Sequence, residues 1–381
     1  MFLSLLYYLL FAANLICCYR QKKATPIVLI SIAILGLMFY ANDGSYGDHI
    51  SYMMDFYSGE RTREGDILYS KFMIAMKDFG IQKYQTFLLS IFLFELVFIG
   101  MGVKAFTTNA HALIAVSMFY IFPFFAVGLR YSMALAVAIF AMQFLFKKRF
   151  LIFAALITIA SFFHICLASV AVLGVCFIKK LSEDRFYNGK LPFWLFLAIG
   201  GGFCVALFFM GTNWIRGPLA IFINTYLDER GMIYLENGVG NGNGMLLLLP
   251  EYFFSVYLSL KILRFTQSTP IIKDETREDY EYAKTNYLIN VLAVVFYALF
   301  CITPSFLRLL VIPTFTNTIM LGRLYQRKTD FSCRGVHADY TKINLIFSCF
   351  VFTWIIPVIF KMFSIGAPNW IESTLRYFKL I

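Results

Sequence analysis

Polar residues that interrupt apolar sequence are the first candidates for chemistry in this chain. Arg130 stands in an apolar stretch from 112 to 146, and Arg308 stands within PSFLRLLVIP. His164 lies in the middle of the apolar run 150–178. An arginine in such surroundings is costly unless it reaches an interface or is paired, and its planar guanidinium suits bidentate contact with an anionic group. A histidine can accept or donate a proton near neutral pH.

The polar segment after the second apolar run adds an acid and a second imidazole, Asp48 and His49. Apolar residues follow at helical spacing: Ile50, Met53, Met54 and Tyr57. This spacing predicts a short amphipathic helix on the membrane surface. Asp48 stands at its N-cap position, so capping is the plain alternative to a role as a base for a hydroxyl. A second interfacial helix is predicted from Phe72, Ala75, Met76 and Phe79.

Each of the other candidates also has a plainer interpretation. Arg130 can extend to the outer surface with its stem along apolar neighbours, and His164 can be a packed, hydrogen-bonded side chain. Glu95 and Glu251 lie within predicted helices and need partners, which makes them candidates for pairing with an arginine.

The composition indicates a membrane protein. Of the 381 residues, 60% are hydrophobic and 14% are charged, and the mean hydropathy is +0.72. Only helices or closed barrels satisfy their backbone in lipid, and no barrel alternation is present. We therefore predict an all-α polytopic transmembrane protein with about 10–12 helices of roughly 20 residues, forming one integral membrane domain over 1–381. The apolar runs are 1–19, 24–41, 85–105, 111–128, 131–146, 150–178, 191–212, 244–265, 285–304, 306–323 and 343–363.

The net charge of +11 indicates orientation, because Lys and Arg collect in short cytoplasmic loops. Basic clusters at 20–23, 147–149 and 179–180 follow this rule, which places 42–83 and 213–243 outside as two outer loops. No nucleic-acid motif accompanies them, so no nucleic acid is expected as a partner. The eight cysteines lie mostly in apolar runs without metal-ligand spacing, and neither a metal nor a cofactor is expected.

The run 150–178 has a basic cluster at each end, so both ends are expected on the cytoplasmic side. Its 29 residues are too few for two full spans, which need about 40. A helical hairpin that enters from the cytoplasm, breaks near Ser161–His164 and returns resolves this conflict. One long tilted helix is the alternative. With the hairpin, its tip points toward the same outer face as Arg130.

Three stretches together carry a family resemblance. The first outer loop contains Asp-x-x-x-Tyr, from Asp48 to Tyr52. Arg130 opens the Ala-rich segment GLRYSMALAVAIFAMQFLFKKRF, which is followed by Ala-x-x-x-His ending at His164, and Arg308 precedes a run ending at Pro313. In these stretches the chain resembles the EpsG-like branch of the Wzy-type O-antigen and capsular polysaccharide polymerases. The family usually has Gln after the first arginine, whereas this chain has Tyr131.

The resemblance implies a GT-C-like membrane glycosyltransferase that is inverting and metal-independent. Such a polymerase transfers a growing glycan from undecaprenyl diphosphate to a sugar hydroxyl of a new lipid-linked repeat unit, outside the bacterial cytoplasmic (inner) membrane. It implies that Arg130 and Arg308 clamp the diphosphate and that Asp48 or His164 activates the hydroxyl. Further substrate-binding candidates are His49, Tyr52, Arg216 and Arg230. Expected partners are the undecaprenyl-diphosphate-linked oligosaccharide, membrane lipid, and a chain-length regulator and flippase of the same pathway.

Two other classes compete with this hypothesis. A flippase or transporter for lipid-linked oligosaccharides also needs an arginine-lined cavity, but its commonest type has repeated halves, and the sequence shows no internal repeat. A membrane O-acyltransferase also uses an intramembrane histidine, but its signatures are absent from this sequence.

Overall fold

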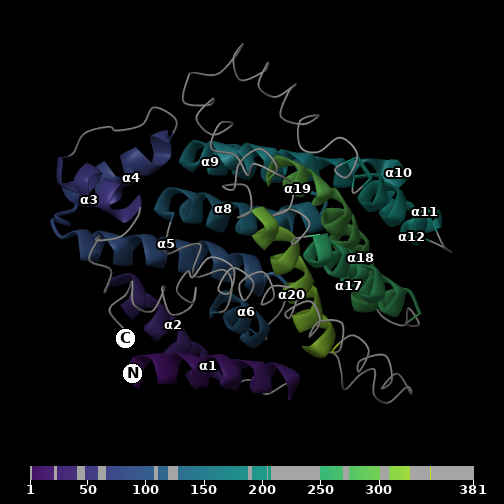
Figure 1. Ribbon diagram of the computed structural model, residues 1–381, viewed down its shortest axis with the longest axis horizontal. Coiled ribbons are helices and arrows are strands. Elements are labelled where there is room, and N and C mark those ends of the chain that lie inside the picture. The colour runs from purple at the N-terminus through teal and green to yellow at the C-terminus, as the bar shows by residue number, and fades with distance from the viewer. Residues whose placement is uncertain are drawn as a thin grey trace, which may run out of the picture. The chain divides into compact units, whose positions relative to one another are not determined.

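The computed structural model describes residues 2–20, 24–40, 48–58, 66–106, 110–118, 128–187, 191–203, 205–206, 249–268, 274–300, 309–326 and 344. Every element within these ranges is a helix (Figure 1). The prediction of an all-α chain is confirmed for this part of the protein. The predicted span 343–363 lies outside it, apart from residue 344.

The helices follow the apolar runs of the sequence. Helices α1 (Phe2–Tyr19), α2 (Thr25–Tyr40), α5 (Tyr84–Lys104) and α8 (Leu129–Phe146) begin and end within two residues of predicted spans. Among the described helices, α5 and α8 are long and apolar enough to cross a bilayer, and shorter apolar helices accompany them. These features are consistent with a membrane protein. The total number of spans remains a prediction.

The described residues form two compact units. The first contains residues up to 174 together with 318–326, and the second contains residues 175–300 and 309–317 with residue 344. In the first unit, neighbouring helices pack in the order α9 (Phe150–Phe163), α8, α5, α2 and α1 (Figure 1). Helix α8 is buried along its length except at Arg130, Phe140 and Phe144. It is therefore the central helix of this unit.

A glycine permits the close approach of α5 and α8. A Cβ atom at Gly102 would lie 3.2 Å from the Ile139 carbonyl oxygen and 3.3 Å from the Phe140 Cα atom. Small residues commonly allow such backbone approach between membrane helices. The packing of α8 against α5 thus depends on the absence of a side chain at position 102.

A buried polar chain connects the first helices. The Ala24 N–H donates to His111 Nε2 at 3.1 Å, and His111 Nδ1 lies 2.8 Å from Asn14 Oδ1. Asn14 Nδ2 in turn donates to Ser31 Oγ at 2.8 Å. Because Nε2 accepts, Nδ1 carries the proton and donates to Asn14. The chain joins α1, α2 and α6 (His111–Val116).

The run 150–178 is broken, as predicted. Helix α9 ends at Phe163, His164 is extended with φ −158° and ψ 118°, and a 3₁₀-helix, η2, covers Ile165–Phe177. A Cβ atom at Gly174 would lie 3.8 Å from the Phe150 ring, whereas one continuous α-helix would place these residues about 36 Å apart. The chain therefore returns along α9, and the single tilted helix is wrong.

The returning arm has the periodicity of its helix type. Its buried residues are Leu167, Val170, Leu173 and Cys176, each 0% exposed. They recur every third residue, as a helix with three residues per turn requires for a single buried face. A 3₁₀ segment of 13 residues is unusually long. It reaches about 26 Å, against about 20 Å for an α-helix of the same length.

The segment 42–83 contains both predicted helices, α3 (Asp48–Ser58) and α4 (Ile67–Asp78). Helix α3 buries Tyr52 and Phe56 and leaves Ile50, Met54 and Tyr57 exposed. An exposed apolar face on a short helix suits the membrane surface. Helix α4 buries Tyr69 and Met73 rather than the residues from which it was predicted.

The second unit is built around α17 (Leu249–Ser268) and α18 (Asp274–Leu292), which pack against each other. Around them lie α10 (Lys179–Ser182), α11 (Asp184–Tyr187), α12 (Leu191–Phe196), the π-helical turn Leu197–Gly201, α19 (Val294–Phe300) and the first residues of α20 (Val311–Gln326).

A buried amide network joins three of these helices. Asn317 Nδ2 donates to Ser255 Oγ at 3.0 Å and to Asn290 Oδ1 at 2.9 Å. Asn286 Nδ2 donates to Asn317 Oδ1 at 2.9 Å. The three asparagines are 0% exposed, and such interhelical hydrogen bonds hold apolar helices together in register.

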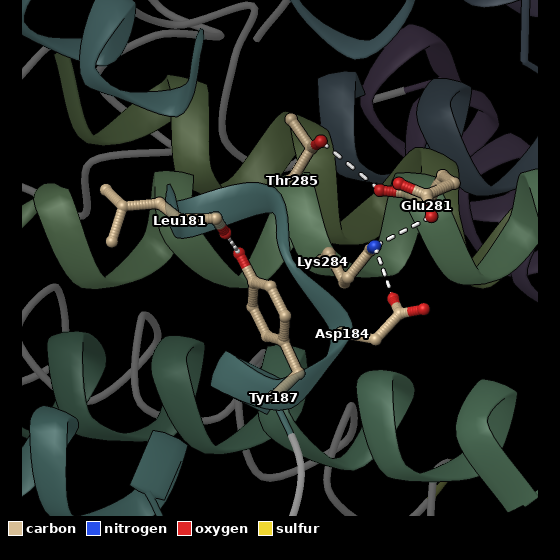
Figure 2. A network of polar contacts seen from close by, with 6 residues as sticks. All are labelled: Leu181, Asp184, Tyr187, Glu281, Lys284 and Thr285. Atoms are coloured by element: carbon tan, nitrogen blue, oxygen red, sulfur yellow. Dashed lines mark hydrogen bonds and ion pairs between the residues drawn. The ribbon is translucent and has the colours of Figure 1, made fainter. Parts of the chain in front are cut away.

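A lysine attaches the 181–187 segment to α18 (Figure 2). Lys284 Nζ donates to Asp184 Oδ1 at 2.8 Å and to Glu281 Oε1 at 2.7 Å. It also lies 5.7 Å from the Tyr187 ring centre, and the Tyr187 hydroxyl donates to the Leu181 carbonyl at 2.5 Å. The charge pattern assigns both segments to the same side of the membrane, and their contact agrees with that assignment.

Candidate functional site

Arg130 is the centre of a polar cluster at the start of α8. Its Nη1 forms an ion pair with Asp66 Oδ2, and the two side chains are each 11% exposed. Its Nε donates to the Tyr52 hydroxyl at 3.5 Å, and its Cζ lies 5.3 Å from the Tyr52 ring centre. Arg130 is therefore held by a carboxylate and an aromatic ring, and it does not simply extend to the surface.

Asp66 is the functional candidate that the sequence did not reveal. It occupies the N-cap position of α4 but makes no capping hydrogen bond with its side chain. An aspartate at this position ordinarily caps the helix, which contributes about 0.5–2 kcal/mol. Here the carboxylate contacts Arg130 instead. A local preference is thus given up for a tertiary contact, as occurs at functional sites.

Tyr69 lies one helical turn from Asp66 on the same helix. Its side chain is 3% exposed, its ring centre is 5.8 Å from that of Tyr52, and its hydroxyl has no hydrogen-bond partner among the described residues. Burial, together with the neighbouring Tyr52, raises the pKa of Tyr69 well above its usual range, so it remains a phenol. A buried hydroxyl without a partner costs about 1–3 kcal/mol.

His164 lies at the same end of α8, as predicted from the hairpin. Its ring packs edge-on against Tyr131 at a centroid distance of 5.5 Å. Its Nδ1 accepts the Cys166 N–H at 3.3 Å, so the proton of the neutral ring is on Nε2. In this tautomer Nε2 is a hydrogen-bond donor. Tyr131, which replaces the Gln usual in the resembled family, is 1% exposed and forms the surface behind the imidazole.

Glu95 has no arginine partner among the residues that the structure describes. Its Oε1 is hydrogen-bonded to Ser132 Oγ, which also donates to the Leu129 carbonyl at 2.8 Å. The carboxyl that pairs with Arg130 belongs to Asp66, in the segment that precedes α4.

The structure thus brings three of the predicted site residues to one end of α8: Arg130, Tyr52 and His164. The backbone of Asp48 and His49 forms the first turn of α3, and their side chains lie outside what the structure describes. Arg216, Arg230 and Arg308, with the 213–243 loop, also lie outside the described residues.

Comparison with known protein families gives one match. A family model described as the EpsG family matches residues 27–375. The chain belongs to the EpsG family. This is the family of Wzy-type polysaccharide polymerase-like proteins, so the resemblance seen in the sequence is confirmed. EpsG membership and the apolar helices together indicate a membrane protein with a polymerase-like role in polysaccharide biosynthesis. No curated protein and no solved structure matches the chain.

Proposed function

We propose that this EpsG-family protein is a glycosyltransferase that polymerises undecaprenyl-diphosphate-linked oligosaccharide repeat units. It does so on the outer face of the bacterial cytoplasmic membrane, which it crosses many times. The observation that carries this proposal is the Arg130–Asp66–Tyr52 cluster with His164 beside it, at the end of α8 that the charge pattern assigns to the outer face.

The reaction transfers a glycan between two lipid-linked molecules. The oxygen of an acceptor sugar hydroxyl forms a bond to the anomeric carbon of the donor glycan. The bond from that carbon to the undecaprenyl diphosphate breaks, the electron pair leaves with the diphosphate, and the hydroxyl proton passes to a base. Attack from the face opposite the diphosphate inverts the anomeric centre. The enzyme accelerates this step by holding both partners and by stabilising the charge on the leaving group.

The residues have the following proposed roles. Arg216, Arg230 and Arg308 contact the diphosphate, because arginine suits phosphate oxygens in pairs. Arg130, already paired with Asp66, contacts the reacting sugars. His49 and Tyr52 contact the sugars. Asp48 and His164 are the candidate bases within the sequence motifs. His164 would first have to exchange its tautomer, because its Nδ1 accepts the Cys166 N–H and Nε2 carries the proton. A flippase and a chain-length regulator of the same pathway are proposed partners.

Glycan profiling of a deletion strain tests this function. The strain is complemented with the wild-type gene or with Arg130→Ala, Arg308→Ala or His164→Ala. A polymerase defect leaves single repeat units on their final anchor, whereas a flippase defect leaves no repeat units on the surface. We expect single units in all three variants. Normal polymer length in all three would refute the site, and an empty surface would favour the flippase.

A reporter fused after residue 185 tests the topology. The hairpin of α9 and η2 returns the chain to the side from which it entered, so a cytoplasmic signal is expected. A matched fusion within 213–243 should report from the outside. An extracytoplasmic signal at residue 185 would invert the assignment of every later loop and separate the arginines of 213–243 from Arg130.

A further inference from the structure

We propose that the Asp66–Arg130–Tyr69 group binds the acceptor sugar hydroxyl and that Asp66 takes its proton. This inference rests on the proposed polymerase function. It assigns the base to Asp66 in place of Asp48 or His164, and it makes the Arg130 cluster an acceptor subsite.

The charge of the cluster favours a neutral ligand. The positive charge of Arg130 is already matched by the carboxylate of Asp66, and the two groups are in direct contact at low exposure. A diphosphate placed here would repel Asp66 and compete with it for the guanidinium. A sugar hydroxyl carries no charge and leaves the ion pair intact.

The unpartnered Tyr69 hydroxyl identifies where the ligand binds. It is buried without a hydrogen-bond partner among the described residues. Asp66 is the N-cap residue of α4 and Tyr69 is the third residue of that helix, so both lie in its first turn. A sugar hydroxyl can accept from Tyr69 and donate to Asp66 at the same time. The rings of Tyr52 and Tyr69 pack against each other 5.8 Å apart, which fixes the position of the Tyr69 hydroxyl.

The orientation of Asp66 supports this role. At the N-cap position of α4 its carboxylate could accept a hydrogen bond from the helix backbone. It makes no such bond and contacts Arg130 instead. The ion pair with the guanidinium fixes the position of the carboxylate. An ionised, positioned carboxylate beside a hydroxyl donor is what general-base catalysis requires.

The proposed step balances in atoms and charge. The acceptor O–H bond breaks and its proton goes to Asp66, while the acceptor oxygen bonds the anomeric carbon and the carbon–diphosphate bond breaks. Asp66 becomes neutral, and its pair with Arg130 changes from no net charge to one positive charge. The leaving diphosphate gains one negative charge in the same step. Asp66 later releases its proton to water.

Purified protein in lipid nanodiscs tests the assignment. Both substrates are extracted from the organism itself: a single lipid-linked repeat unit from the deletion strain as acceptor, and wild-type lipid-linked polymer as donor. Elongation is followed by gel as the acceptor concentration varies. Asp66→Asn keeps an oxygen that can accept from Arg130 but removes the base, so we expect kcat to fall by at least about 100-fold. Binding of the acceptor should remain within threefold.

Tyr69→Phe removes only the hydroxyl and keeps the buried ring. We expect it to raise KM for the acceptor about tenfold and to leave kcat within threefold, a division that a purely structural role would not give. The matched control is Asp78→Asn, which makes the same chemical change at an exposed residue at the other end of α4; it should elongate like wild type.

The outcomes separate the two proposals. If the wild-type protein elongates and Asp66→Asn elongates within threefold of it, Asp66 is not the base and the inference is wrong while the function stands. If Asp66→Asn elutes as aggregate, the Tyr69→Phe result decides, and an unchanged KM overturns the assignment. A wild-type protein that elongates nothing from its own lipid-linked unit refutes the polymerase function itself, and the acceptor subsite with it.

Discussion

Two clusters in this protein have nearly the same composition and different chemistry. Each places one buried cation beside carboxylates and tyrosine rings: Arg130 with Asp66 and Tyr52, and Lys284 with Asp184 and Glu281. The carboxylates of Lys284 are 70% and 39% exposed, whereas Asp66 is 11% exposed. The hydroxyl of Tyr187 is satisfied within the Lys284 cluster. The hydroxyl of Tyr69 has no such partner among the described residues.

This difference in exposure and in hydroxyl partners suits the Lys284 cluster to attaching a segment and the Arg130 cluster to the proposed binding of a ligand. Around Lys284 the polar contacts satisfy one another within the chain, so the cluster fixes one segment onto a helix. Burial lowers the pKa of Lys284, but its hydrogen bonds to Asp184 and Glu281 outweigh this effect. The net pKa lies above the ordinary value, so the lysine remains charged. Beside Arg130 the Tyr69 hydroxyl has no partner among the described residues, and the proposed acceptor would supply one.

The largest expected effect is on polymer formation. Arg130→Ala removes the partner of Asp66 and a group at the proposed reaction centre, so we expect the elongation rate to fall by about 100-fold or more. Lys284→Ala removes an attachment far in sequence from that centre and should stay within threefold of wild type. Polymer length on gels from complemented deletion strains measures both. Equal losses in the two variants would remove the functional distinction between the clusters.

The next effect is on stability, and it follows from exposure. Asp66→Ala leaves a largely buried guanidinium unpaired, which should cost about 3–5 kcal/mol. Asp184→Ala breaks an ion pair whose acid is mostly exposed, and should cost at most about 1 kcal/mol. Thermal unfolding in one detergent, with equal expression of both variants, compares them. A larger loss for Asp184→Ala would reverse the comparison.

The smallest effect isolates single hydroxyl groups. Tyr187→Phe removes the hydrogen bond to the Leu181 carbonyl and should destabilise the protein by about 1 kcal/mol. Tyr69→Phe removes a buried hydroxyl without a described partner, so the ligand-free protein should be as stable as wild type or slightly more stable. The two melting temperatures, measured without substrate, are expected to shift in different directions. A clear loss of stability in Tyr69→Phe would mean that the chain itself satisfies this hydroxyl.

The hairpin could be predicted because the charges alone create the conflict that it resolves. Basic residues at both ends of 150–178 require an even number of crossings, and the run is too short for two full ones. The break at His164 and the return of Gly174 toward Phe150 follow that logic. What the charges could not specify was the 3₁₀ form of the returning arm, which depends on packing at every third residue.

The partner of Arg130 could not be predicted in the same way. The sequence indicates that a buried arginine needs an acid, but the first outer loop alone offers several. Asp66 precedes an amphipathic helix, so local rules assign its side chain to capping. Tyr69 carries no signal beyond the helical spacing of α4. Only the packing of α4 near the start of α8 selects these residues, and such contacts between distant segments are not encoded in local pattern.

The returning arm of the hairpin imposes a rule on length rather than on residue type. In η2 each residue turns the chain by about 120° and advances it by about 2 Å. Removing one residue between Ile165 and Phe177 would therefore turn every later buried residue of η2 away from the interior by about 120°. Homologous sequences should accept exchanges among apolar residues here and should show no insertions or deletions. An alignment of the family across these 13 positions would test this constraint directly. We expect the 13 positions to form a block without gaps.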